Sequence, residues 1–283
     1  MSGIPDGACD CHAHVFGPPA RFPFDPARTY TPGEASVEQL EAHQAALGLT
    51  RVVIVQPSPY GVDNSCTLDA ARRLGDNARV VAVVAANLGT EALRGLHAAG
   101  VRGIRLNLET VGQSDPAIVG TMLRAAADLV APLGWHVQTY TNLGVIDALH
   151  RVLAELPVPV VIDHFGRSMA AGGVGQSGFA ALLDLVSKGR AYVKLSAPHR
   201  IAAQPDDAGL IARALIAANP ARMLWGSDWP HAAGRPGGRD PAVIEPFAAI
   251  DDHRALARLL EWAGDPATAR AILVDNPARL YGF

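Results

Sequence analysis

The sequence has no excess of positive charge and no long uninterrupted apolar run. Its 283 residues contain 24 lysines and arginines against 27 aspartates and glutamates, a net charge of −3. Because basic and aromatic residues do not interleave and no basic stripe occurs, the composition argues against a nucleic-acid partner. No run of about 18 apolar residues is present, so neither a membrane span nor a membrane partner is predicted. Residues 1–7 lack the basic and apolar regions of a secretory signal.

Cysteine is also scarce, with only Cys9, Cys11 and Cys66 in the chain. Cys9 and Cys11 lie two positions apart in one predicted strand, where they cannot easily bridge each other. An odd number of cysteines without a disulfide framework is typical of a reducing compartment, and we therefore predict a cytoplasmic protein. A monomer and a small homo-oligomer are both compatible with the sequence.

Apolar residues, by contrast, are abundant: 49% of the chain is hydrophobic and 18% is charged, which supplies a sizeable core. Short runs rich in β-branched residues recur, each followed by a helical pattern and none joined to the next by a hairpin signal. These runs are 8–16, 51–56, 80–86, 103–108, 135–140, 158–164, 191–196 and 223–228. Alternating strands and helices imply a parallel sheet, and this number of units predicts a (β/α)8 TIM barrel, one α/β domain over residues 1–283. The alternative, an open doubly wound sheet, is less favoured because no glycine-rich dinucleotide fingerprint follows any strand.

Several helix boundaries carry local signals. Ser36 and Gln39 form an S-x-x-Q capping box that opens a helix to about Leu47. Asp115 and Pro116 open a helix that extends to Leu133, with proline at its first position. Further helices are predicted over 64–74, 90–99, 143–156, 178–188, 205–218, 241–250, 251–263 and 265–273. The proline- and glycine-rich loop at 17–33 is long for a connector. Its residues 22–24 and Tyr30 are expected either to form a lid or to pack over the first strand.

Polar residues collect at the carboxyl ends of the predicted strands, where the active site of such a barrel lies. His12 and His14 are two residues apart and can face a common ligand from one strand. The remaining polar residues are Gln56, Ser58, Arg105, Asn107, Tyr140, Asp163, His164, Arg167, Ser196, His199, Arg200, Ser227, Asp228 and His231. Any one of them alone is more often structural. Their number at one rim favours a functional cluster built on His12, His14, His164 and Asp228.

Three of these strand ends carry distinctive motifs. They are Asp-x-His-x-His at 10–14, Asp-His-Phe-Gly-Arg at 163–167 and Trp-Gly-Ser-Asp-Trp-Pro-His at 225–231. Together they resemble the amidohydrolase superfamily, and within it the branch of 2-pyrone-4,6-dicarboxylate lactonase and related lactone hydrolases. The resemblance covers most of the chain and includes 14–18, 21–24, 30–32, 100–105, 134–137, 194–196 and 274–277.

The resemblance implies roles for individual residues. It implies that Asp228 is the general base and that the carbonyl of a lactone is polarised by His12, His14 and His164. It further implies substrate contacts from Arg105, Arg167, Arg200, Tyr30 and Tyr140. Where the family has a second arginine after the fourth strand, this sequence has Val111. The resemblance therefore implies a lactonase without fixing the pyrone dicarboxylate as its substrate.

A metal ion is the main question about cofactors. Zinc takes nitrogen and carboxylate ligands, which are available from His12, His14, His164 and Asp228. Arg105, however, occupies the strand-four position of the metal-binding residue in related enzymes, and its cation would repel a metal. Tyr140 ends the fifth strand, whereas His136 lies about 13 Å earlier, at ~3.3 Å per residue, near the barrel floor. Glu109 could complete a metal site if its turn bends back. We predict that no cofactor is required, with zinc as the alternative.

The predicted reaction is hydrolysis of a small anionic lactone. Asp228 takes a proton from the attacking water. The three histidines donate to the carbonyl oxygen, and at least some of them must carry a proton on the nitrogen that faces the substrate. Arg105, Arg167 and Arg200 suit a substrate carboxylate, because a guanidinium binds it bidentately. Ser58, which follows the second strand, is a further candidate substrate contact.

Three other functions stay open from the sequence. One is a lactone isomerase, in which a group of the substrate replaces water as the nucleophile. A second is a zinc-dependent decarboxylase or hydrolase of the same superfamily. A third is a non-catalytic binding protein for small organic acids. A lactonase of this kind would serve the catabolism of aromatic compounds or sugar acids. Lys194 and Asp10 are expected to pair as structural charges inside the barrel.

Overall fold

A computed structural model describes residues 3–232 and 240–283 of the chain. Eight parallel strands form one sheet in the order β1-β3-β4-β5-β6-β7-β8-β9. Their bounds are β1 Cys9–Ala13, β3 Arg51–Val55, β4 Ala78–Ala82, β5 Val101–Leu106, β6 His136–Thr139, β7 Val160–Ile162, β8 Ala191–Ser196 and β9 Met223–Gly226. Each of these eight strands overlaps one of the predicted apolar runs, with shifts of a few residues at the ends.

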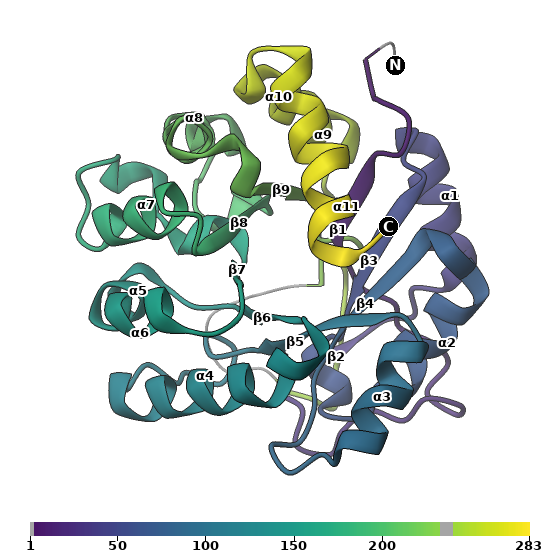
Figure 1. The fold of residues 1–283 in the computed structure, drawn as a ribbon. Coiled ribbons are helices and arrows are strands. Elements are labelled where there is room, and N and C mark those ends of the chain that lie inside the picture. The colour runs from purple at the N-terminus through teal and green to yellow at the C-terminus, as the bar shows by residue number, and fades with distance from the viewer. Residues whose placement is uncertain (1–2, 233–239) are drawn as a thin grey trace.

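The first and last of these strands lie side by side, and helices surround the strands on the outside (Figure 1). Two backbone hydrogen bonds join the segments that follow them. The His14 N–H donates to the Trp229 carbonyl oxygen at 2.8 Å, and the Asp228 N–H donates to the His12 carbonyl oxygen at 2.8 Å. The predicted (β/α)8 barrel is confirmed, and its closure brings the residues after β1 next to those after β9.

Eleven α-helices are described, and several begin at the residues that the capping signals predicted. In α1 the capping box is complete, because Ser36 and Gln39 each accept a hydrogen bond from the backbone N–H of the other. Asp115 caps the long helix α4 by accepting from two backbone N–H groups. The helices are α1 Val37–Leu47, α2 Ser65–Leu74, α3 Thr90–Ala98, α4 Pro116–Val130, α5 Leu143–Ala148, α6 His150–Glu155, α7 Phe179–Ser187, α8 Gly209–Ala218, α9 Asp252–Ala263, α10 Pro266–Arg270 and α11 Asn276–Tyr281.

The predicted helix at 241–250 is wrong. Pro246 would lie in its interior, where proline removes a backbone hydrogen bond. This segment instead forms the short strand β10, Ile244–Glu245, which pairs with β2, Thr31–Pro32. The predicted helix at 143–156 is also divided in two, because Leu149 between α5 and α6 leaves the helical backbone conformation.

The loop at 17–33, predicted to form a lid or to pack over the first strand, is attached to the barrel at several points. Phe16 pairs with Ala35 across its base, and β2 pairs with β10 near its end. Its side chains Phe22 and Tyr30 are buried. A lid function for the loop stays a prediction, but its last part is held against the barrel rim and carries Tyr30 there.

The end of the barrel opposite the strand carboxyl ends is closed by apolar and aromatic side chains. Tyr281 from α11 packs with Cys9 and Cys11 of β1. The Cys11 thiol donates a hydrogen bond to the Cys9 sulfur at 3.8 Å, and neither cysteine is in a disulfide. His136, at the start of β6, packs edge-on against Tyr281, with ring centroids 5.2 Å apart. Gly103 on β5 leaves room for this ring, because a Cβ at that position would lie 2.4 Å from it.

One helical segment meets the length and hydropathy of a membrane span. It runs over Pro116–Leu133, α4 and the turn after it, and 33% of it is buried in the protein. No such segment was predicted from the sequence. The buried residues of α4 form one stripe that includes Val119, Leu123 and Val130, as expected for a helix of the barrel's outer layer. The finding is therefore weak evidence for a membrane location.

Candidate active site

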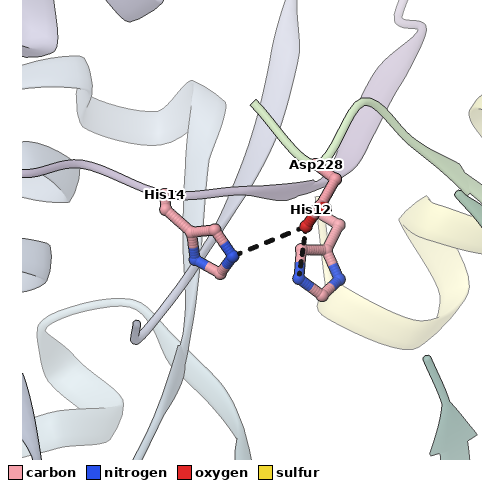
Figure 2. A group of neighbouring side chains, drawn as sticks. All are labelled: His12, His14 and Asp228. Carbon is pink, nitrogen blue, oxygen red and sulfur yellow. Dashed lines mark ion pairs between the residues drawn. The ribbon is translucent and has the colours of Figure 1, made fainter. Parts of the chain in front are cut away.

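Four side chains converge at the carboxyl ends of the barrel strands. His12 lies near the end of β1 and His14 just beyond it, His164 follows β7, and Asp228 follows β9. Asp228 Oδ1 lies 3.6 Å from His12 Nε2, 3.6 Å from His14 Nε2 and 3.7 Å from His164 Nε2. Figure 2 shows the rings of His12 and His14 directed at this oxygen. All four residues are buried, so the structure brings together the cluster named from the sequence.

Two of these residues have unusual backbone conformations. The φ angles of His164 and Asp228 are 49° and 66°, in the left-handed region that non-glycine residues rarely occupy. Such conformations persist only where the surrounding structure maintains them, and they cluster at functional sites. At Asp228 that support comes from the neighbouring Ser227, whose N–H and hydroxyl both donate to the Asp10 carboxylate. Asp10 also accepts from the His12 N–H, so one buried carboxylate ties the β1 and β9 ends together.

The tautomer of His14 follows from its partner. His14 Nδ1 lies 2.7 Å from the Val55 carbonyl oxygen, and a carbonyl only accepts, so Nδ1 must carry a proton. A neutral His14 therefore presents a lone pair at Nε2. His164 Nδ1 contacts the Ser196 hydroxyl at 2.8 Å, and this hydroxyl can donate or accept. Burial lowers the pKa of His164 to about 3 despite the opposing influence of Asp228, so its ring is neutral at pH 7.

Arg200 is bound to the candidate base. Its Nη2 and Nε donate to Asp228 Oδ2 at 2.8 and 3.1 Å. Burial raises the pKa of Asp228, but Arg200, His164, His14 and His12 together outweigh it and hold the pKa well below its usual range. Asp228 is thus ionised at pH 7, with Oδ2 held by the guanidinium and Oδ1 facing the three ring nitrogens.

A second buried carboxylate, Asp163, lies behind the cluster. Its Oδ2 accepts from Arg105 Nε at 3.0 Å and from Gln138 at 3.1 Å, and it forms an ion pair with Arg105 Nη2 at 2.9 Å. Its Oδ1 lies 3.7 Å from Lys194 Nζ. The predicted pairing of Lys194 with Asp10 is wrong, because the hydrogen bonds of Asp10 go to Gln44, Ser227 and the His12 backbone. Lys194 instead forms its ion pair with Asp163.

Sequence reasoning named Asp163 as a strand-end residue and as the first residue of the 163–167 motif, without a role of its own, and did not single out Gln138. A usable signal existed for Gln138, because it lies in β6 two residues before Tyr140, and residues two apart in an extended chain point to the same side. For Asp163 no local signal distinguished it from the adjacent His164. Its importance comes from Arg105, Gln138 and Lys194, which reach it from three other strands.

The predicted substrate contacts lie around the cluster in two groups. Tyr30, from the 17–33 loop, lies close enough to Ser58 and Arg200 for both to lower the pKa of its hydroxyl, against the larger effect of burial. Burial raises the pKa of Tyr30, so its hydroxyl keeps its proton at pH 7. On the other side, Arg167 donates to the Tyr140 hydroxyl at 3.0 Å.

Glu109 does not join the histidine cluster. Its carboxylate lies 3.3 Å from Arg167 Nε and accepts from Asn142 at 3.0 Å. The expectation that its turn could complete a metal site is therefore wrong. Arg105 faces the ring of Tyr140, with the guanidinium carbon 5.8 Å from the ring centroid, and so borders the same rim.

The donor atoms of these residues are close enough together to hold a metal ion. The ion pairs of the carboxylates and the protonation of His12 do not suit one. His12, His14 and Asp228 offer donor atoms within 4.8 Å of one another. However, the carboxylates Asp163 and Asp228 are already paired with the cations of Arg105, Lys194 and Arg200. A divalent cation would add uncompensated positive charge in a buried place. In addition, His12 Nδ1 lies 3.3 Å from Lys194 Nζ, a donor that favours a proton rather than a ligand lone pair on Nε2.

Comparison with known proteins gives a consistent family. The chain matches the amidohydrolase family model over residues 9–283. It is 35% identical to a 4-sulfomuconolactone hydrolase of Rhizobium radiobacter, covering 99% of this chain and 91% of the relative. It is 36% identical to a 2-pyrone-4,6-dicarboxylate hydrolase of Comamonas testosteroni, covering 98% and 91%. A D-galactarolactone isomerase of Agrobacterium fabrum is more distant, at 28% identity over 98% and 92%.

A solved structure shares the fold over its whole length. It is a putative 2-pyrone-4,6-dicarboxylic acid hydrolase from Pseudomonas putida, with a TM-score of 0.83 and 32% identity, covering 98% of this chain and 97% of that one. The barrel and its buried histidine-aspartate rim define an amidohydrolase-type enzyme scaffold. The chain belongs to the amidohydrolase family, and the relatives at 35% and 36% identity are lactone hydrolases.

Proposed function

We propose that this protein hydrolyses the ring ester of a small anionic lactone. The observation that carries the proposal is the environment of Asp228: one oxygen is held by Arg200, and the other faces three ring nitrogens at 3.6, 3.6 and 3.7 Å. A buried, ionised carboxylate beside three imidazole nitrogens suits the activation of water next to a polarised carbonyl. The lactone hydrolases among its relatives support the same reaction class.

In the proposed mechanism, a water oxygen bonds to the carbonyl carbon while Asp228 Oδ1 takes the water proton. His12 and His164 donate from Nε2 to the carbonyl oxygen, on which negative charge develops. The ring C–O bond then breaks, the leaving oxygen takes up the proton, and the product is the open hydroxy acid. The sequence predicted that all three histidines donate. In this proposal His14 instead accepts a hydrogen bond from the water through its Nε2 lone pair.

The arginines and tyrosines at the rim would recognise the charge of the substrate. Arg105, Arg167 and Arg200 belong to the same rim as Tyr30 and Tyr140, on a protein whose net charge is −3. A local positive region attracts a small carboxylate and increases its encounter rate. Ser58 would join this group, because it lies close enough to Tyr30 to lower the pKa of that hydroxyl.

We further propose that no metal is required. A zinc ion would be held by His12, His14, His164 and Asp228, and when bound it would polarise a carbonyl or activate a water. The existing pairing of both carboxylates with three cations argues against an additional divalent ion. In the proposal, N–H groups of the histidine rings polarise the carbonyl in place of a metal ion.

The test is turnover of a panel of carboxylated lactones, with products identified by mass and NMR. Opening to a hydroxy acid with uptake of one water is expected. Formation of an isomeric lactone without water uptake would replace the hydrolase by an isomerase. Asp228→Asn is expected to lower kcat on the order of 10³-fold, because a general base contributes about 10²–10⁴. The matched control is Asp184→Asn, a surface carboxylate paired with Lys188. Normal turnover by Asp228→Asn would refute the base assignment.

A further inference from the structure

Lysine is the rarest charged residue of this chain. Of its 24 basic residues only two, Lys188 and Lys194, are lysines. Lys188 is a surface residue paired with Asp184. Lys194, on β8, is completely buried in the barrel. A buried ammonium is costly unless several partners compensate it, so its contacts indicate what it does there.

Within the described part of the chain, the ammonium of Lys194 contacts the side chains of Gln138, His12 and Asp163. Nζ donates to Gln138 Oε1 at 2.7 Å and to His12 Nδ1 at 3.3 Å, and it lies 3.7 Å from Asp163 Oδ1. An ammonium can only donate hydrogen bonds. His12 Nδ1 must therefore accept with a lone pair, and the proton of the neutral ring is on Nε2.

A competing partner for the same nitrogen is present. Asp163 Oδ1 lies 3.3 Å from His12 Nδ1, and it would favour a proton on that nitrogen. This oxygen is buried without a hydrogen-bond partner in the described chain, so its contact with the His12 ring is electrostatic and not a hydrogen bond. The contact that is made comes from Lys194, and it selects the opposite tautomer.

We propose that Lys194 is a positioning residue that holds His12 in the tautomer with its proton on Nε2, directed at the carbonyl oxygen of the substrate. Lys194 touches no reacting atom and acts only through His12. His12 Nε2 is buried and has no hydrogen-bond partner in the described chain, which leaves this proton available for the substrate. The inference rests on the proposed function for its catalytic consequence, but not for the tautomer itself.

Removal of the donor should reverse the tautomer. In Lys194→Met, His12 Nδ1 would carry the proton and bond to Asp163 Oδ1. The Nε2 lone pair would then face the developing negative charge on the carbonyl oxygen. Loss of one such donor typically lowers kcat on the order of 10²-fold, and KM should stay nearly unchanged because the rim residues are intact.

The first experiment measures the tautomer without any substrate. Nitrogen-15 NMR of histidine-labelled, full-length enzyme reports which ring nitrogen carries the proton, and the His12 signal is the one absent from His12→Gln. The wild-type protein should show a protonated Nε2, and Lys194→Met should show a protonated Nδ1. A protonated Nδ1 in the wild-type enzyme would overturn the inference, even if lactone turnover is found and even if Lys194→Met does not fold.

The second experiment is a double-mutant cycle on the hydrolysed lactone. Lys194→Met should lower kcat strongly in the wild-type background and have little further effect in His12→Gln. The control Lys188→Met removes the other lysine and should leave kcat unchanged. An equal loss in both backgrounds would show a general structural role and overturn the inference. If no lactone is hydrolysed, the proposed function fails, while the NMR result still decides the tautomer.

Discussion

Arg200 should control the acid limb of the pH–rate profile through Asp228. Two of its nitrogens lie 2.8 and 3.1 Å from Asp228 Oδ2. Unit charges about 4 Å apart interact by about 4 kcal/mol at an effective dielectric constant near 20. Since one pKa unit corresponds to about 1.4 kcal/mol, the upper limit is about 3 units. Arg200 is slightly exposed, so water will replace part of this interaction, and we expect Arg200→Met to raise the Asp228 pKa by about 1–2 units.

The direction of the Asp228 pKa change in Arg200→Met follows from the effect that Arg200 has in the wild type. Arg200 holds the pKa of Asp228 below its usual value, so removal of the guanidinium raises it. The base must be ionised to accept a proton, and the acid limb of kcat/KM should therefore move to higher pH. The ionised Asp228 contributes stability above the unfolded-state pKa, which is lost as pH falls through the folded-state pKa. The free energy of unfolding at pH 7 should thus fall by about 1.4 kcal/mol per unit of pKa rise.

The assay is kcat/KM against pH for the wild type, Arg200→Met and the control Arg151→Met, an exposed arginine paired with Glu155. KM should also rise in Arg200→Met, because Arg200 is proposed to bind the substrate carboxylate. An acid limb that stays in place while KM rises would show that Arg200 acts on the substrate alone. The reasoning that links it to the base would then be refuted.

Three further predictions concern the buried polar network and the metal. Asp163→Asn should lower the free energy of unfolding by about 3–5 kcal/mol in denaturant titration, because Arg105 and Lys194 lose their buried counter-charge; a loss no larger than that of Asp184→Asn would contradict this. Burial, with a smaller effect of Lys194, lowers the pKa of His136 to about 3, so stability should fall as pH drops below the unfolded-state value of ~6.5. His136→Leu should make that fall shallower by about 1.4 kcal/mol per pH unit between about pH 6 and 4, and an unchanged slope would refute the assignment. Exhaustive chelation followed by metal analysis should leave kcat unaltered, whereas activity proportional to bound zinc would show that the metal is required.

The fold was accessible from the sequence because its signals are local. Alternating apolar runs and helical patterns predict barrel strands, and cap residues such as Ser36 and Asp115 mark helix starts. The helix prediction failed where a local helical pattern competed with pairing to a distant part of the chain. The segment 241–250 has helix-forming residues, yet Pro246 and the pairing of β10 with β2 prevent a helix.

The sequence by itself determined the barrel and the identity of the residues that gather at its rim. His12, His14, His164 and Asp228 could be named because parallel strands place their carboxyl ends on one side. Only the tertiary structure decided how these residues are paired. The Val55 carbonyl and Lys194 impose opposite tautomers on His14 and His12, and Arg200 binds the base. These contacts join residues far apart in the chain, with separations set by strand register and barrel closure, which no local pattern encodes.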